Sequence, residues 1–251
     1  MEQDEIASAA AMLLQARRSG QWLDGLPAAL TPQNEIDAYA VQDAVMREIR
    51  PVGGWKVGAR GPEAVPNCAP LTRGLIFAQG ESLPGELLRL RGVEAEIGFI
   101  LSADLPPRAA PYSIDEIAGH IGSVHPTLEI VESRYADFRQ VAPMSVLADS
   151  NSNGALIVGP AVPAQSRDAY GRLGVSLKFD GVEKIATNGG NPAIDLLRLL
   201  TWLANHCAVR CGGLRRGEIV TTGSHTGMLF AAPGMRVEAS FAGLGGVAVS
   251  L

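Results

Sequence analysis

The sequence has no long apolar run, no cluster of basic residues and few cysteines. No stretch approaches the roughly 20 apolar residues that a membrane helix needs, so we expect no transmembrane segment. The net charge is -5, and lysine and arginine form no run that could follow a phosphate backbone or an anionic membrane surface. We therefore expect neither a nucleic acid nor a membrane as a partner.

The three cysteines, Cys68, Cys207 and Cys211, are too few and too scattered for a disulfide framework. The pair at 207 and 211 also lacks the second pair of ligands that a structural zinc site needs. The first five residues include three acids and no base, unlike the basic start of a signal peptide. These features predict reduced cysteines in a cytoplasmic protein.

The residues that are present suit one large globular domain. The chain has 251 residues, of which 47% are hydrophobic and 19% charged. We expect a single catalytic domain over 1–251, in which a helical lobe at 1–50 precedes a β-rich core at 51–251. Apolar spacing predicts a first helix at 6–18 that Gly20 ends. A second helix should begin at Thr31, as N-cap, and end before Pro51.

After Pro51 the sequence changes to short apolar segments separated by glycine and proline. A capping box at Ser113 and Glu116 predicts a helix at about 113–121. Helical spacing predicts another from Asn191 and Pro192 to about Asn205. We expect strands at 55–57, 74–77, 93–101, 127–131, 155–158, 175–179, near 220, 237–241 and 247–251.

The strand expected at 93–101 carries two acids on one face. Its apolar residues alternate with Glu94 and Glu96, so both carboxylates share the face opposite the apolar side chains. At about 3.3 Å of rise per residue these side chains lie about 7 Å apart, which lets both reach one cation. The alternative is an ordinary half-buried strand with a solvated outer face.

A third acid, Glu129, lies between the large apolar residues Leu128 and Ile130. A carboxylate in such a setting costs free energy unless it is paired or bound to a metal. Glu132 points to the other side of the same strand, and we expect it to pair with Arg134.

If the two strands pack together, Glu94, Glu96 and Glu129 form a face of three carboxylates suited to Mg²⁺ or Mn²⁺. Octahedral positions would then stay open for water and substrate. The four histidines are scattered and form no pair at helical spacing, so we expect none of them to be a ligand.

Lys56 lies in a short apolar segment bounded by glycines. Such a lysine either extends its ammonium to solvent or, beside an acidic metal site, binds a substrate carboxylate or transfers a proton. The loop at 221–224 offers hydroxyl and backbone N–H groups to an anion, or is a simple glycine turn. The polar run from Asp149 to Gly154 is either a turn or a pocket wall.

Six motifs follow one another along the chain: DAYAVQ at 37–42, GWKVG at 54–58, EAEI at 94–97, LEIVESR at 128–134, NGGNP at 188–192 and GEIVTTG at 217–223. With these motifs the chain resembles the hydratase/decarboxylase branch of the fumarylacetoacetate hydrolase superfamily. The resemblance covers nearly the whole chain, and the order and spacing of the motifs make it specific.

The resemblance implies an α+β fold, a mixed β-sheet roll with an N-terminal helical lobe. It also implies a divalent metal, Mg²⁺ or Mn²⁺, held by Glu94, Glu96 and Glu129. Lys56 and Glu96 are expected to be catalytic, while Lys56, Ser152 and Thr222 are expected to bind substrate. The family further suggests a homo-oligomer with a small 2-oxo acid as substrate.

The activity implied is metal-dependent hydration of a 2-hydroxy-2,4-dienoate, or its 2-oxo tautomer, to a 4-hydroxy-2-oxo acid in aromatic catabolism. The metal would act as a Lewis acid while C5 is protonated and water adds at C4. The closest alternative is decarboxylation of a 2-oxo-3-enedioate such as 4-oxalocrotonate. Hydrolysis of an acylpyruvate is a more distant alternative, and a non-catalytic 2-oxo acid-binding or partner subunit is one of another class.

One segment departs from the family pattern. Members typically carry Asp-Tyr-Gly between the lysine strand and the acidic strand, and its aspartate is expected to take part in proton transfer. Here the corresponding residues, 69–74, read APLTRG. Either another group, such as Lys56 or a metal-bound water, moves the proton, or the reaction differs from that of the typical member.

Overall fold

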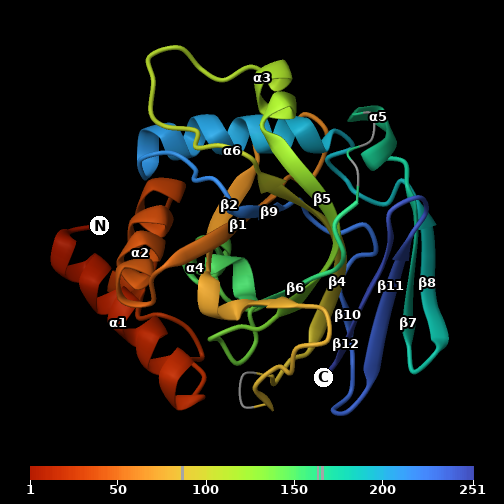
Figure 1. The fold of residues 1–251 in the computed structure, drawn as a ribbon. Helices are drawn as coiled ribbons and strands as arrows, with labels where there is room; N and C mark the ends of the chain where they lie inside the picture. Colours follow the sequence, from red (N-terminus) through yellow and green to blue (C-terminus); the bar gives the residue numbers. More distant parts are fainter. Residues whose placement is uncertain (86–87, 163, 165–166) are drawn as a thin grey trace.

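Two helices at the N-terminus pack against each other beside the main sheet (Figure 1). The structure, a computed structural model, describes residues 1–251 except 86–87, 163 and 165–166. Helix α1 spans Gln3–Ser19 and ends, as predicted, at Gly20, whose φ of 67° suits glycine. Helix α2 spans Glu35–Glu48.

The prediction that Thr31 caps the second helix was wrong. Asn34 is the N-cap, and its side chain accepts a hydrogen bond from the backbone N–H of Asp37. Residues Ala28–Leu30 form a short 3-10 helix instead, and the Thr31 N–H donates to Ala28 at its end. Pro32 therefore lies before the helix.

The main sheet has eight strands and curls around the centre of the molecule (Figure 1). Its order is β2-β1-β9-β4-β5-β6-β3, with β10 paired to β4. The pairs β1/β9 and β3/β6 are parallel and the others antiparallel, which makes the sheet mixed, as predicted. The strands span β1 Val52–Gly58, β2 Asn67–Thr72, β3 Ile76–Ala78, β4 Gly92–Leu101, β5 Ile121–Val131, β6 Asn153–Val158, β9 Ile219–Thr221 and β10 Leu229–Phe230.

A second, antiparallel sheet lies on one side of the main sheet, and helix α6 lies along another side (Figure 1). The order of the second sheet is β12-β11-β7-β8. Its strands span β12 Gly245–Ser250, β11 Arg236–Phe241, β7 Gly174–Phe179 and β8 Val182–Asn188. Helix α6 spans Leu196–Arg210. The shorter helices are α3 Ile114–Gly119, α4 Pro143–Ala148 and α5 Arg167–Tyr170. No helix among the described residues is long and apolar enough to cross a membrane.

Several elements differ from the predicted ones. Strand β5 begins at Ile121 and not near 127, because Pro126 lies within the strand without ending it. Helix α6 begins after the N-cap Asp195, four residues later than predicted, and continues to Arg210. Strands β2 and β8 and helix α4 were not predicted. Residues 73–75, which overlap the strand predicted at 74–77, form a 3-10 helix before β3.

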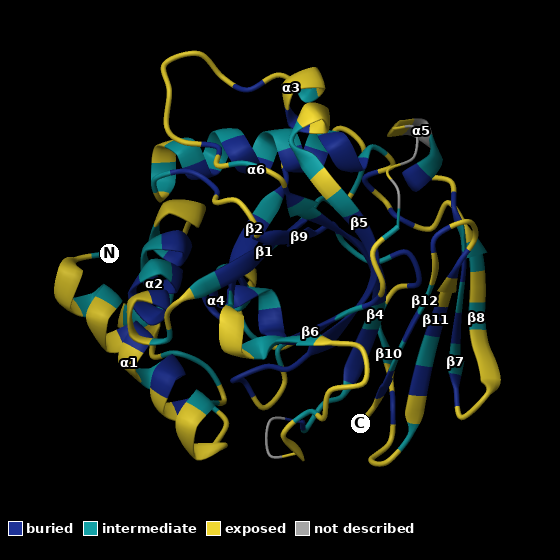
Figure 2. Ribbon diagram, in the orientation of Figure 1, coloured by how far each residue is buried: buried dark blue, intermediate teal, exposed yellow. Residues whose placement is uncertain are grey.

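The two faces of β4 have different roles. Val93, Ala95, Ile97 and Phe99 are fully buried in the larger hydrophobic core, as the alternation predicted. Figure 2 shows buried residues along these central strands and exposed ones on the outer helices. The opposite face of β4 carries the two acids, and it looks toward the inside of the curl, where side chains from β1, β2 and β5 converge.

The lysine strand and β9 lie very close together at Gly54. Gly54 pairs with Ile219 in the parallel β1/β9 ladder. A Cβ atom at position 54 would lie 2.3 Å from the Ile219 carbonyl oxygen, a contact that only a backbone shift can relieve. Glycine at this position therefore sets the spacing of the strands that carry Lys56 and Thr221.

We predict that Gly54→Ala lowers the free energy of unfolding by about 1–3 kcal/mol, because the new methyl group overpacks this backbone contact. Urea denaturation measures the change. Gly74→Ala is the matched control, since a Cβ there meets no atom within 4 Å. Equal effects of the two substitutions would contradict the role assigned to Gly54.

Candidate functional site

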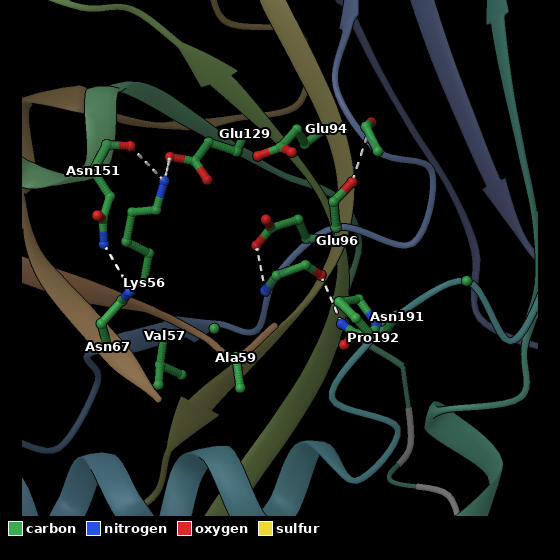
Figure 3. A pocket seen from close by; sticks show the side chains of 15 residues that line it. Lys56, Val57, Ala59, Asn67, Glu94, Glu96, Glu129, Asn151, Asn191 and Pro192 are labelled. Carbon is green, nitrogen blue, oxygen red and sulfur yellow. Dashed lines mark hydrogen bonds and ion pairs between the residues drawn. The ribbon is translucent and has the colours of Figure 1, made fainter. Parts of the chain in front are cut away.

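Three carboxylates meet where β4 and β5 lie side by side. In this antiparallel pair Glu94 is opposite Glu129, and Glu96 is opposite Thr127. One carboxylate oxygen from each glutamate lies within 4.8 Å of the others. Glu96 and Glu129 are buried and Glu94 is partly exposed. Figure 3 shows the three side chains directed toward one another.

The three acids oppose one another's ionisation. Burial, with the neighbouring Glu129 carboxylate, raises the pKa of Glu94 to about 7. Burial, with the Glu129 and Glu94 carboxylates, raises the pKa of Glu96 to about 8. Without a cation, part of this cluster is therefore protonated near neutral pH.

The loop after β9 holds Glu96. The Thr221 hydroxyl and the backbone N–H of Gly223, the latter at 3.0 Å, both donate to the same Glu96 oxygen. Gly223 has a φ of 82°, a conformation that favours glycine. The loop at 221–224 thus does bind an anion, as one interpretation of its sequence suggested, and that anion is the protein's own carboxylate.

Lys56 extends from β1 to the acids and does not reach out to solvent. Its Nζ lies 2.5 Å from an oxygen of Glu129 and 3.1 Å from the backbone oxygen of Asn151. Burial lowers the pKa of Lys56, but the carboxylates of Glu129, Glu94 and Glu96 outweigh this effect and the pKa is raised. Lys56 is therefore an ammonium at neutral pH.

These side chains line a cavity of about 510 Å³ (Figure 3). Amides surround the charged groups, since Asn67, Asn151 and Asn191 line the cavity as well. Among the lining residues, all of which the structure describes, Lys56 is the one lysine or arginine. The full lining is Lys56, Val57, Gly58, Ala59, Asn67, Glu94, Glu96, Glu129, Asn151, Gly190, Asn191, Pro192, Gly223, Ser224 and Gly227.

The carboxylate cluster fits a divalent cation. The second oxygen of Glu129 is buried and has no hydrogen-bond partner, and such an orphaned oxygen is costly unless an ion binds it. When all three acids are ionised, the single ammonium leaves two negative charges without compensation. A divalent cation, which prefers oxygen ligands, answers both features.

Comparison with known proteins identifies the family. Residues 76–251 match the family described as fumarylacetoacetate (FAA) hydrolase C-terminal. The chain is 31% identical over 252 residues to the 2-keto-4-pentenoate hydratase of Paraburkholderia xenovorans (strain LB400), an alignment covering 95% of this chain and 92% of the relative. The chain belongs to the fumarylacetoacetate hydrolase family.

Two further proteins are similar to this chain. The 4-oxalocrotonate decarboxylase of a Pseudomonas species is 30% identical over 162 residues, which cover 63% of this chain and 59% of that protein. The solved structure of 4-oxalocrotonate decarboxylase from Pseudomonas putida G7, complexed with magnesium and adipate, has a TM-score of 0.87 and 23% identity, and it covers 99% of this chain and 97% of that one. This second likeness shows that the fold is the predicted one.

The structure brings Lys56 and the three glutamates together, but it places Ser152 and Thr222 behind the cavity wall. The Thr222 hydroxyl donates to the backbone oxygen of Ile97 at 2.8 Å. Thr222 does not line the cavity. Ser152 is buried, and its hydroxyl has no hydrogen-bond partner. Its backbone oxygen accepts the N–H of Glu132.

The segment that lacks the family aspartate is apolar where it faces the site. Residues 69–72 lie in β2, where Ala69 is opposite Lys56 and Leu71 is opposite Gly54, and residues 73–74 begin the 3-10 helix that follows. Leu71 packs in a small cluster with Leu156 and Ile219. No described residue of this segment supplies an acid to the cavity.

The prediction that Glu132 pairs with Arg134 was wrong. Glu132 accepts the backbone N–H groups of Arg89 and Arg91 at 2.7 and 2.9 Å. Arg134 forms a buried ion pair with Asp149 instead. Strand β5 ends at Val131, so Glu132 and Arg134 lie beyond it, where the alternation of an extended strand no longer fixes their directions and proximity in the sequence was a poor guide.

The sequence analysis missed the amides around the charged groups. Asn153 donates to Glu129 at 3.0 Å, and Asn151 donates to Asn67 at 3.0 Å. The asparagines at 151 and 153 lie in the polar run that was interpreted as a turn or a pocket wall. The high number of asparagines in this run was the available signal for a polar pocket wall. The directions of their side chains could not be predicted, because they depend on the backbone conformation.

We predict that the stability of the metal-free protein falls as pH rises from about 5 to 8. In this window the folded state binds more protons than the unfolded state, because folding raises the pKa of Glu94 and Glu96, so the free energy of unfolding decreases with pH. Added Mn²⁺ should raise the melting temperature most at the upper end of the window, since its ligands are deprotonated carboxylates.

Melting curves at several pH values, with chelator and with Mn²⁺, check this prediction. Glu96→Gln is the control, because it removes one of the two titrating groups and should flatten the pH dependence. A wild-type protein that Mn²⁺ does not stabilise at any pH would contradict it.

Proposed function

We propose that this protein is a metal-dependent hydro-lyase that adds water to a 2-hydroxy-2,4-dienoate, or its 2-oxo-4-enoate tautomer, to give a 4-hydroxy-2-oxo acid. The observation that carries the proposal is the meeting of three carboxylates with one ammonium group in a single cavity. The comparisons support the proposal because the sequence is 31% identical to that of a 2-keto-4-pentenoate hydratase along nearly the full length of both chains.

In this proposal Glu94, Glu96 and Glu129 hold the divalent cation. When bound, the cation supplies Lewis-acid stabilisation of negative charge on the substrate's 2-oxygen. The finer choice of Mg²⁺ or Mn²⁺ rests on the all-oxygen ligand set. Relatives of this fold have been solved with magnesium and with Mn²⁺.

Lys56 binds the substrate carboxylate in this proposal. Two of its three N–H groups are directed to Glu129 and Asn151, which leaves the third for a ligand in the cavity. A proton added at C5 and a hydroxyl added at C4 together make up one water molecule. Because its raised pKa keeps Lys56 charged, this residue acts as a donor and does not serve as the base.

The remaining expectations are part of the same proposal. Ser152 and Thr222 contribute to substrate binding indirectly, by supporting the cavity wall, since neither lines the cavity. The chain acts as one catalytic domain with its helical lobe at 1–50. The expected reduced cysteines suggest a cytoplasmic protein. The family suggests a homo-oligomer, and light scattering on the purified protein tests the oligomeric state.

Decarboxylation of 4-oxalocrotonate is the second candidate, and one observation bears on it. A dicarboxylate substrate brings a second negative charge into the cavity, and a buried charge needs a partner. Lys56 is the one cation among the lining residues and already contacts Glu129. The cavity therefore favours a substrate with a single carboxylate, which is the hydratase type.

We predict that Glu96→Gln reduces metal-dependent hydration at least about a thousandfold, because it removes a charged ligand of the cation. Following the absorbance of 2-hydroxypenta-2,4-dienoate measures hydration. Glu116→Gln is the control, since Glu116 is exposed and pairs with Arg108 away from the cavity. Full turnover by the Glu96 variant in the presence of chelator would overturn the metal assignment.

We also predict that the wild-type protein prefers 2-hydroxypenta-2,4-dienoate to 4-oxalocrotonate by at least about a hundredfold in kcat/KM, because the described residues that line the cavity offer no second cation for a second carboxylate. Product analysis by NMR distinguishes hydration, decarboxylation and acylpyruvate hydrolysis. Binding of a 2-oxo acid without any turnover would support the non-catalytic alternative.

A further inference from the structure

Three successive residues beside the cavity adopt a left-handed backbone conformation. Ser150, Asn151 and Ser152 have φ values of 53°, 50° and 56°. None of them is glycine, and residues with a Cβ atom adopt this conformation at a cost in free energy. Asparagine tolerates it better than most residues. Such strain persists only where the surrounding structure imposes it, and it occurs preferentially at functional sites.

Arg134 imposes the conformation on this left-handed turn, residues 150–152, by binding the backbone on both sides of it. Its guanidinium donates to the backbone oxygen of Asp149 at 2.8 Å, before the turn, and to that of Asn153 at 2.9 Å, after it. The same guanidinium forms an ion pair with the Asp149 carboxylate. That carboxylate also accepts a hydrogen bond from the backbone N–H of Arg134 at 3.0 Å. Both residues are buried, so the whole arrangement is shielded from solvent.

The left-handed turn directs the backbone carbonyl of Asn151 at Lys56. The carbonyl oxygen of Asn151 accepts a hydrogen bond from Lys56 Nζ (Figure 3). The Asn151 side chain donates to Asn67 on β2, which ties the turn to the strand next to the one that carries Lys56. Neither the backbone oxygen nor the side-chain amide of Asn151 is hydrogen-bonded to Glu94, Glu96 or Glu129.

We propose that Asn151 is a positioning residue for Lys56, acting through its backbone carbonyl. With Glu129 and the Asn151 carbonyl each accepting one N–H, the ammonium cannot rotate freely, and its third N–H is aimed into the cavity. The left-handed turn thus fixes the direction of the donor that meets a substrate carboxylate. This inference rests on the proposed function for the identity of the ligand, a 2-oxo acid.

The test compares Asn151→Gly with Asn151→Ala. Both substitutions remove the amide that reaches Asn67, but glycine adopts a φ near 50° without strain and alanine does not. The affinity for 2-oxopentanoate, an analogue with no double bond to hydrate, is measured in Mn²⁺ by calorimetry, or by thermal-shift titration for weak variants. The affinity for Mn²⁺ alone is measured in parallel.

If the carbonyl positions Lys56, Asn151→Gly keeps the analogue affinity within about threefold of wild type and Asn151→Ala weakens it about tenfold or more, with Mn²⁺ affinity unchanged in both. In a Lys56→Met background the difference between glycine and alanine should disappear, because the carbonyl then has no ammonium to orient. A purely structural role for the turn would leave that difference intact.

Asp180 provides the matched control. It has a φ of 49° in the hairpin between β7 and β8, and it does not line the cavity. Asp180→Ala should lower the melting temperature relative to Asp180→Gly, while both variants bind 2-oxopentanoate like the wild type. This result separates left-handed strain as such from strain at the turn beside Lys56.

Equal analogue affinities of the glycine and alanine variants at 151 would overturn the inference, as would a glycine-alanine difference that survives in the Lys56→Met background. Failure of the wild type to bind 2-oxopentanoate would overturn it too, because Lys56 would then orient no ligand. Normal analogue binding by a protein that hydrates no dienoate would refute the proposed function and leave the positioning role standing.

Discussion

The balance of charge between three carboxylates and one ammonium is the constraint on which the rest of the site depends. Glu96 and Glu129 are buried, and Lys56 is close to Glu129. In a setting of low dielectric, like charges this close cannot all remain ionised without a cation. The raised pKa values of Glu94 and Glu96 express this conflict. The fold must therefore hold the cluster together against its own repulsion.

The curled sheet provides that restraint. The two strands that carry the acids, β4 and β5, form an antiparallel ladder that keeps its register from Gly92 to Ile100 of β4, and the opposite face of β4 is buried in the larger core. Separating the acids would mean breaking this ladder and exposing that core, which costs far more than a single pair of like charges. The repulsion therefore appears as proton uptake in the metal-free protein and as affinity for a cation, and not as a distorted strand.

The sequence predicts the part of this site that depends on period-two alternation. Glu94 and Glu96 share a face because strands alternate, and Glu129 stands out because its neighbours are apolar. The positions of Ser152 and Thr222 could not be predicted in the same way, since loop backbone angles decide where their side chains point. The pairing of Arg134 with Asp149 and the direction of Asn151 depend on contacts between segments at least 15 residues apart. Local spacing contains no information about such contacts.

The absent family aspartate restricts how protons can move. Leu71 lies on the lysine face of the sheet, opposite Gly54, and packs with Leu156 and Ile219. This cluster is apolar, so its residues offer no titratable group to the lysine. The titratable side chains that line the cavity are Lys56 and the three glutamates, and the lysine is already held by two acceptors. This arrangement favours proton exchange with solvent through the cavity, where the partly exposed Asn67 and Ser224 provide polar groups that can hold water.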